Sequence, residues 1–145
     1  MGKIFNNYNV NICDGIIGWK DAIILSAKPL LNDAYIGEEY LDAIFDNLEK
    51  YGPYIDFGLE VAVPHARPEF GVKKTGVSLL KLKNKVYLQE SDDHPIKLII
   101  TFCSVDDTSH IEILKEISSI FGDGEKLGKI KEANSVEEIL EIINN

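Results

Sequence analysis

The sequence is poor in three things that would otherwise direct the search for a function: long apolar runs, positive charge and cysteine. No apolar stretch approaches the length of about 20 residues that crosses a bilayer, and no apolar segment typical of a secretory signal opens the chain. Lys and Arg together number 15 against 24 for Asp and Glu, which gives a formal net charge of −9. Because general binding to a phosphate backbone needs clustered positive charge, we expect a cytoplasmic protein that neither spans a membrane nor binds nucleic acid.

Motifs for metals and nucleotides are also missing. The two cysteines, Cys13 and Cys103, lie far apart in the sequence, and without a secretory signal we expect free thiols that pack as small apolar residues. The sequence has no HExxH or CxxC spacing for zinc, no GxGxxG or GxxxxGK(S/T) loop for phosphates and no GxSxG turn. We therefore expect neither a metal nor a cofactor. The acidic surface suits a partner protein that is basic where it docks, and it suits simple solubility equally well.

The 145 residues are enough for one domain with one substantial core, and we expect that domain to cover residues 1–145. Apolar residues recur at helical spacing near both ends of the chain, while the middle contains short apolar runs of strand length. Helices around a strand-rich middle predict an α/β sandwich. Pro29, late in the first helix, should kink or end it. The predicted helices cover residues 19–31, 37–50, 108–121, 124–132 and 136–143, and the predicted strands cover 60–63, 76–82, 86–88 and 97–103.

Two of these helices begin with a recognisable capping pattern. Thr108 or Ser109 is the expected cap of the third helix, and Glu112, three residues after Ser109, would complete a capping box. Ser135 and Glu138 form the same pattern at the start of the last helix. Both patterns predict well-defined helix starts.

Of the three histidines, His65 lies in the most restricted segment. It follows an apolar run and is bracketed by Pro64 and Pro68, whose rings restrict the backbone. A strand that delivers a side chain to the loop at its end is how α/β folds present functional groups, and the nearby Arg67 suits bidentate contact with phosphate. These features predict a phosphate-accepting histidine, although a turn histidine packed against its own loop fits the pattern equally well.

The other two histidines carry weaker signals. His110 falls in the first turn of a predicted helix, where free N–H groups and the helix dipole favour anions and a neutral imidazole. An exposed helix residue would give the same pattern. His94 lies in an acidic loop and is expected to have no catalytic role.

Residues 63–69 (VPHARPE) and 71–77 (GVKKTGV) resemble the EIIA components of the bacterial phosphoenolpyruvate-dependent sugar phosphotransferase system. The resemblance is to the fructose/mannitol-type superfamily. Residues 51–54 (YGPY), with the Arg-Pro-Glu after the histidine, look most like ascorbate-type members, and galactitol-type members come next. Residues 106–110 are similar to the second histidine motif of the family, and residues 135–140 to its last helix. The resemblance covers nearly the whole chain, from the first predicted helix to the C-terminus.

The resemblance implies a single α/β domain with a central mixed β-sheet of about five strands, flanked by helices on both faces. It implies a phosphotransferase that takes a phosphoryl group from phospho-HPr onto His65 and passes it to a cysteine of a separate EIIB protein, which serves a membrane EIIC channel. His110 would then orient His65 or the phosphate. Arg67 and Thr75 would be phosphate-side groups.

Three positions depart from the family pattern. Ala66 stands where ascorbate-type relatives typically have glycine, and Glu60 where many relatives have glycine in the strand before the histidine. Asn47 falls where mannitol-type members place an active-site arginine, which leaves Arg67 as the nearest substitute. The last two departures leave open whether phosphotransfer is altered.

Other functions remain open from sequence alone. A regulatory module of the same fold would also be phosphorylated on His65 but would control a target protein by binding it. An unrelated hydrolase would act on a small molecule without HPr. The sequence names neither the sugar nor the oligomeric state, although a homodimer is possible because some relatives pair.

Overall fold

The centre of the fold is a strand that is buried on both faces. Pro95–Cys103 (β4) is apolar along nearly its whole length, as expected for a strand covered on both sides. Its alternate side chains enter two separate cores: Ile99 and Cys103 on one face, Ile100 and Phe102 on the other. The structure, a computed structural model, describes residues 4–145. Residues 1–3 of the expected domain lie outside the described residues.

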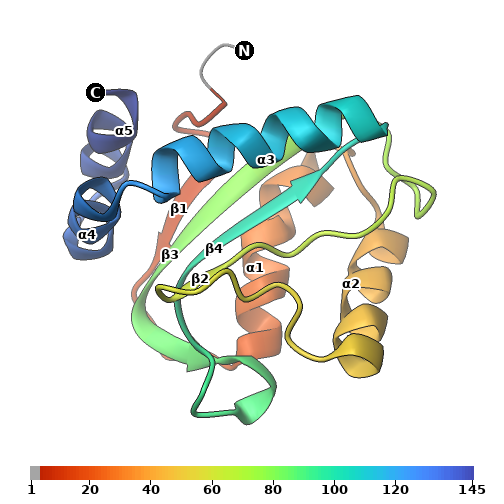
Figure 1. Cartoon of the computed structure of the whole chain (residues 1–145), viewed down its shortest axis with the longest axis horizontal. Helices are drawn as coiled ribbons and strands as arrows, with labels where there is room; N and C mark the ends of the chain where they lie inside the picture. The colour runs from red at the N-terminus through yellow and green to blue at the C-terminus, as the bar shows by residue number, and fades with distance from the viewer. Residues whose placement is uncertain (1–3) are drawn as a thin grey trace.

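Four strands form the sheet within residues 4–145, in the order β1-β3-β4-β2 (Figure 1). β3 and β4 pair antiparallel, whereas β1 pairs parallel with β3 and β2 parallel with β4. The mixed sheet with helices on both faces is therefore confirmed. The strands other than β4 are Val10–Cys13 (β1), Val61–Ala62 (β2) and Gly76–Tyr87 (β3).

The expected number of about five strands is one too many for the described part of the chain. The runs predicted as separate strands at 76–82 and 86–88 form one strand, β3, which continues across an irregularity between Lys81 and Val86. Beyond it, the 3-10 helix η1 (Leu88–Glu90) leads into β4. The sequence patterns missed β1, because its four residues alternate too briefly to stand out from the polar segment around them.

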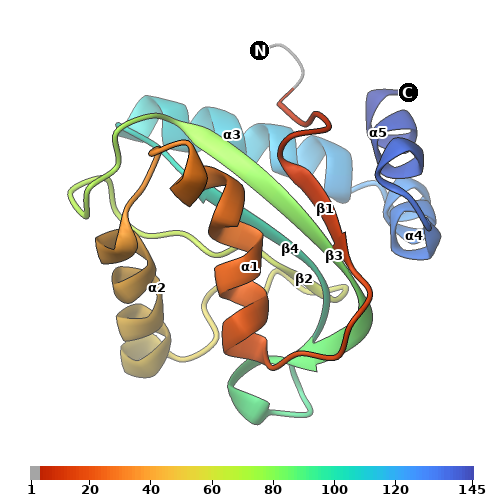
Figure 2. The same ribbon diagram turned by 180° about the vertical axis from the view of Figure 1, so that it is seen from behind.

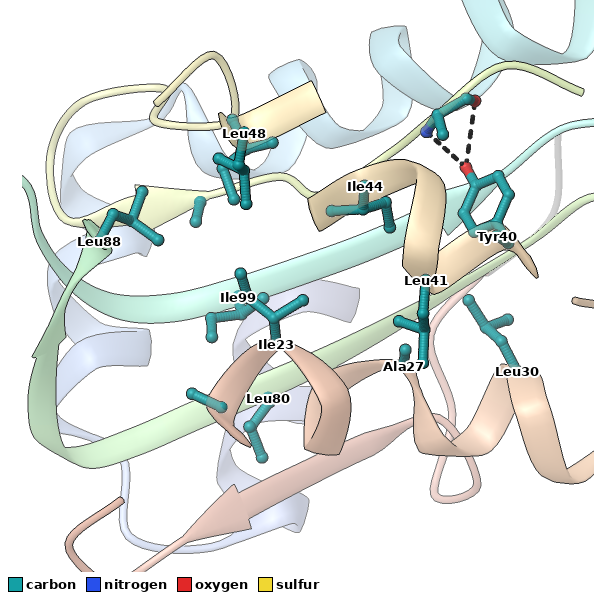
Figure 3. Packing of buried hydrophobic residues seen from close by; sticks show 14 of the residues in the cluster. Ile23, Ala27, Leu30, Tyr40, Leu41, Ile44, Leu48, Leu80, Leu88 and Ile99 are labelled. Carbon is teal, nitrogen blue, oxygen red and sulfur yellow. Dashed lines mark hydrogen bonds between the residues drawn. The ribbon is translucent and has the colours of Figure 1, made fainter. Parts of the chain in front are cut away.

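Helices α1 (Trp19–Asn32) and α2 (Glu38–Tyr51) cover one face of the sheet, as the rear view shows (Figure 2). Their apolar faces meet the side chains of β3 and β4, so that Ile23 of α1 lies between Leu80 and Ile99 in the close view (Figure 3). Pro29 does not end α1, which continues to Asn32. Pro29 has no N–H to donate to the Leu25 carbonyl, so α1 lacks that one hydrogen bond of its last turns.

The opposite face is covered by α3 (Asp107–Phe121), with α4 (Gly124–Glu132) and α5 (Val136–Asn144) at one end of it (Figure 1). The expected cap of α3 is corrected. Asp106 is the N-cap and its side chain accepts a hydrogen bond from the Ser109 N–H, so Ser109 is the third helical residue. Ser135 caps α5 through the Glu138 N–H, as expected. In residues 4–145 no helix combines the length and apolar character that a membrane span requires.

Candidate functional site

His65 lies at the end of the chain segment that runs beside β4. The Val63 N–H donates to the Ile55 carbonyl at 2.8 Å, and the Phe102 N–H donates to the Pro64 carbonyl at 3.2 Å. The backbone is therefore held against the sheet up to the residue before His65. The expectation that a strand delivers this histidine to a loop is confirmed.

The imidazole of His65 is held in one tautomer by its own loop. Its Nδ1 lies 2.7 Å from the Val63 carbonyl oxygen. A carbonyl only accepts hydrogen bonds, so Nδ1 carries the proton and Nε2 keeps a free lone pair. The ring also stacks on Phe102, with ring centroids 5.0 Å apart and an angle of 19° between the planes. Together these contacts leave Nε2 as the ring nitrogen with a free lone pair.

The surroundings of His65 favour its neutral form. Burial of the ring is the main cause that lowers its pKa below the usual value of 6.5. The hydrogen bond to Val63 opposes this shift, and the nearby His110 adds to it. A neutral imidazole at neutral pH is the form that attacks phosphorus.

The peptide group that follows His65 is bound at both of its ends. The Tyr54 hydroxyl donates to the His65 carbonyl at 2.6 Å. The Ala66 N–H donates to the Tyr40 hydroxyl at 2.9 Å, and this hydroxyl lies 2.7 Å from the Phe102 carbonyl, to which it can donate. Figure 3 shows the Tyr40 hydroxyl directed from α2 toward this loop.

His110 and His65 meet at the N-terminus of α3. Their ring centroids are 5.7 Å apart at an interplanar angle of 67°, and both rings contact Phe102. The first turn of α3 also presents free backbone N–H groups. The Asp106 side chain accepts a hydrogen bond from only one N–H group of this turn, that of Ser109. The expectation that the two motif histidines lie together is confirmed in its geometry.

Both histidines line a cavity of about 380 Å³. Arg67 lies at its edge with an exposed side chain, and its Nε is 2.5 Å from a carboxylate oxygen of Glu69. The expected phosphate-side arginine is therefore beside the histidine but bound to an acid two residues away. The residues that line the cavity come from four regions, the end of α2, the loop that follows it, the His65 loop and the start of α3: Asn47, Tyr51, Tyr54, His65, Ala66, Arg67, Pro68, Asp107 and His110.

Thr75 does not line this cavity. It borders a different cavity of about 470 Å³ near the start of β3. Its hydroxyl oxygen accepts a hydrogen bond from the Val105 N–H at 3.1 Å, within the loop that precedes α3. The structure thus places Thr75 where it supports the loop that leads to His110, and not beside His65.

His94 also lies outside the cavity. Its Nδ1 is 2.6 Å from a carboxylate oxygen of Asp56, which connects the turn before β4 to the segment before β2.

Two of the three departures from the family pattern, Asn47 and Glu60, have different surroundings. Asn47 lines the cavity, and its side chain lies beside the Tyr54 phenol. Glu60 points elsewhere: its carboxylate pairs with Lys85 of β3 at 2.5 Å and with Lys131 of α4 at 3.2 Å. Residue 60 therefore belongs to the scaffold, whereas residue 47 belongs to the site.

The sequence patterns missed the roles of Tyr40, Tyr54 and Phe102. Tyr54 ended one of the motifs that carried the family resemblance, but nothing local showed that its hydroxyl binds the backbone 11 residues later. The sequence patterns identified Tyr40 only as an apolar residue of a predicted helix, and Phe102 only as a residue of a predicted strand. Each acts through contacts that the fold creates.

A family model described as the phosphoenolpyruvate-dependent sugar phosphotransferase system, EIIA 2, matches residues 3–145. The chain belongs to this EIIA family. It is 36% identical over 144 residues to the mannitol-specific cryptic phosphotransferase enzyme IIA component of Escherichia coli (strain K12), which covers 99% of this chain and 97% of that protein. It is 33% identical over 127 residues to the ascorbate-specific PTS system EIIA component of the same organism, covering 87% of this chain and 82% of that protein.

Solved structures of the EIIA family share the fold. The solution structure of the mannitol-specific cryptic enzyme IIA of Escherichia coli matches with a TM-score of 0.88 at 36% identity, covering 97% of this chain and 95% of that one. A complex of enzyme IIA-mannitol with phosphorylated enzyme IIB-mannitol from Escherichia coli matches with a TM-score of 0.82 at 22% identity, covering 97% of this chain and 96% of that one. The predicted α/β fold and the predicted class of activity, phosphoryl transfer in a sugar phosphotransferase system, are confirmed.

Proposed function

We propose that this chain is a cytoplasmic phosphocarrier in which Nε2 of His65 accepts a phosphoryl group from phospho-HPr and passes it to a cysteine of an EIIB protein. The observation that carries the proposal is the hydrogen bond between Nδ1 of His65 and the Val63 carbonyl. It assigns the ring proton to Nδ1 and leaves Nε2 with a lone pair beside an open cavity.

In the first step the Nε2 lone pair attacks phosphorus. A bond between nitrogen and phosphorus forms, the bond between phosphorus and its donor atom on HPr breaks, and the donor atom keeps the electron pair. In the second step an EIIB thiolate attacks the same phosphorus and the lone pair returns to Nε2. His65 thus needs no proton transfer in either direction, and the protein contributes positioning and charge stabilisation.

Charge stabilisation can come from three groups at the cavity. His110 is close enough to contact a phosphoryl group on His65, and the first N–H groups of α3 attract anions. Arg67 can contribute once its guanidinium exchanges the Glu69 carboxylate for the phosphoryl oxygens. Asn47 carries no charge, so the positive charge at this edge of the cavity falls to Arg67. Thr75 acts only indirectly, through the loop before α3.

Two features of the relatives support the proposed sugar class and the proposed acceptor. The mannitol-specific and ascorbate-specific relatives suit a transported sugar of the ascorbate, pentitol or hexitol kind. The fold likeness to an enzyme IIA bound to phosphorylated enzyme IIB suits an EIIB acceptor. We place the final sugar phosphorylation at a membrane EIIC protein on a separate chain.

A relay assay tests this function. The wild-type chain is incubated with labelled phosphoenolpyruvate, enzyme I and HPr, separated from them, and mixed with an EIIB protein encoded beside it. We expect the label to move to the EIIB cysteine and to be lost when that cysteine is replaced by serine. A labelled chain that passes nothing to its neighbouring EIIB would contradict the carrier role and support the regulatory alternative.

A further inference from the structure

The peptide group between His65 and Ala66 is hydrogen-bonded to a tyrosine side chain at each of its two ends. Its carbonyl accepts a hydrogen bond from the Tyr54 hydroxyl at 2.6 Å, and its N–H donates to the Tyr40 hydroxyl at 2.9 Å. The two phenols reach it from different places, Tyr40 from within α2 and Tyr54 from the loop after α2. A single peptide plane next to the nucleophile is thus held at both ends by side chains.

We propose that Tyr54 and Tyr40 are positioning residues for phosphoryl transfer, which hold the peptide after His65 so that Nδ1 stays on the Val63 carbonyl and Nε2 stays directed into the cavity. The inference rests on the proposed function of His65. Neither tyrosine is a catalytic residue, because each hydroxyl is already bonded to the backbone of the site.

The hydrogen bond from Nδ1 to Val63 and the packing of the Tyr54 ring on His65 support this role. The imidazole depends on its own backbone, because the bond from Nδ1 to Val63 spans only two residues. Rotation of the following peptide would move the base of the side chain and stretch that bond. The edge of the Tyr54 ring also packs on the imidazole, with ring centroids 5.5 Å apart and an interplanar angle of 72°. Tyr54 therefore contacts both the ring and the carbonyl of the same residue.

Both phenols keep the protons that these bonds need: Tyr54 donates to the His65 carbonyl, and Tyr40 donates to the Phe102 carbonyl while it accepts from the Ala66 N–H. Burial raises the pKa of Tyr54 to about 12, and the side chain of Asn47 beside it only partly opposes the shift. Burial also raises the pKa of Tyr40 above its usual value. Both hydroxyls keep their protons over the whole range in which the site works. Asn47, at the position where the family resemblance implies an arginine, then acts on His65 through Tyr54.

Tyr54→Phe tests the role of the hydroxyl, because it removes one oxygen and keeps the ring that packs on His65. Tyr87→Phe, a half-exposed phenol at the far end of β3, is the matched control. We expect Tyr54→Phe to slow phosphoryl acceptance from phospho-HPr about threefold to tenfold, as the loss of one hydrogen bond allows. We expect Tyr87→Phe to leave the rate unchanged.

A second measurement separates positioning from general destabilisation. Nitrogen-15 NMR of the unphosphorylated imidazoles reports which ring nitrogen carries the proton. In the wild type we expect His65 to be protonated on Nδ1, and in Tyr54→Phe we expect a measurable fraction protonated on Nε2. The spectrum of His94, which lies outside the cavity and is fixed by Asp56, should not change.

The outcomes distinguish the inference from the function on which it rests. An unchanged His65 tautomer together with an unchanged acceptance rate in Tyr54→Phe would overturn the positioning role, even if the wild type is phosphorylated normally. A tautomer shift in a protein whose wild type accepts no phosphate would show that Tyr54 positions the His65 imidazole, and it would overturn the proposed function.

Discussion

At the scale of single residues, the chemistry depends on which nitrogen of His65 is free. The Val63 carbonyl binds Nδ1, Phe102 stacks on the ring, and burial favours the uncharged form. None of these contacts uses Nε2. Nε2 therefore keeps a free lone pair before any partner binds, which is what the proposed phosphoryl transfer requires.

The lowered pKa of His65 gives a pH dependence with a definite sign. Because the folded-state pKa lies below 6.5, the imidazole stays neutral as the pH falls through 6.5 and becomes protonated only below that. We expect the rate of phosphoryl acceptance to stay level from pH 8 to about 6.5 and to fall only at lower pH. The stability that the neutral ring contributes is present above pH 6.5 and is lost as the pH falls through the folded-state pKa. NMR titration of the His65 ring measures its folded-state pKa, and a titration midpoint above pH 6.5 would contradict this expectation.

His110 should matter more for passing the phosphoryl group on than for receiving it. It contacts the His65 ring but none of the bonds that fix Nδ1. We expect His110→Ala to accept phosphate and to pass it to EIIB at least about tenfold more slowly, because a group that stabilises the transferred phosphate is lost. His94→Ala, which changes a histidine outside the cavity, serves as the control. Rapid-quench measurement of both steps decides the matter, and an unchanged transfer rate in His110→Ala would remove its proposed role.

At the scale of elements, α3 holds the second histidine and presents its N-terminal N–H groups to the cavity. Asp106 fixes the start of this helix through the N–H and hydroxyl of Ser109. Asp123 does the same for α4 through the N–H groups of Glu125 and Lys126. The chain thus contains two aspartate caps of one kind, and only the first begins a helix at the site.

This pair gives a matched test of the role of α3. We expect Asp106→Ala and Asp123→Ala each to lower the Tm by roughly 2–5 °C, since each removes an N-cap. We expect only Asp106→Ala to slow phosphoryl transfer, because it loosens the turn that carries His110. Thermal unfolding and transfer rates are measured on both variants. Equal transfer rates at equal loss of stability would show that the start of α3 does not position the site.

At the scale of the whole molecule, Glu60 connects three separate parts of the fold. It lies in a tight turn closed by a hydrogen bond from the Val61 N–H to the Gly58 carbonyl, and its φ of 68° is in the left-handed region. Glycine is common at such a position. The carboxylate compensates by pairing with Lys85 of β3 and Lys131 of α4, so the turn before β2 is bound to both.

Two substitutions separate the ion pairs of Glu60 from its backbone strain. Glu60→Ala loses both pairs and keeps the positive φ, so we expect it to be less stable than the wild type. Glu60→Gly loses the same pairs but relieves the strain, so we expect it to be more stable than Glu60→Ala by about 1 kcal/mol. Neither should change phosphoryl acceptance, because Glu60 does not line the cavity. Urea unfolding measures the difference in stability between the two variants. If Glu60→Gly were less stable than Glu60→Ala, the backbone at residue 60 would not be strained.

The lysine pairs also give Glu60 a pH dependence. The hydrogen bond from Lys85, and then the contacts with Lys131, hold the pKa of this carboxyl below its usual value of 4.5. The stability that this contributes is present at neutral pH and is lost as the pH falls through the lowered pKa. Wild type and Glu60→Ala should therefore differ less in stability in acid.

Much of this fold follows from local patterns. Apolar periodicity located all the helices named from the sequence to within a residue or two. The structure places His65, which the Pro-His-Ala-Arg-Pro segment singled out, at a cavity that His110 also lines. β1 was missed because a strand of four residues is defined by its pairing with β3, not by its own composition. The cap of α3 was misplaced because Asp106 and Ser109 are both good caps, and only the backbone geometry chooses between them.

The least predictable part of the site is the set of contacts between distant segments. The Tyr40 hydroxyl meets Ala66 and Phe102 only after α2 has packed on the sheet. The family resemblance implied a phosphate-side role for Thr75, yet the structure places it just before β3, where its hydroxyl accepts a hydrogen bond from the Val105 N–H. Such roles depend on tertiary structure, so residue type and spacing alone do not determine them.

The most direct test of the central claim is to locate the phosphoryl group itself. The chain, labelled with nitrogen-15 in its histidines, is phosphorylated by phosphoenolpyruvate, enzyme I and HPr and examined by NMR for coupling between nitrogen and phosphorus. We expect one phosphoryl group per chain, coupled to Nε2 of His65, and none in His65→Ala. A wild-type chain that stays unphosphorylated where another EIIA protein is phosphorylated, or a His65→Ala chain that still takes the label, would contradict the claim.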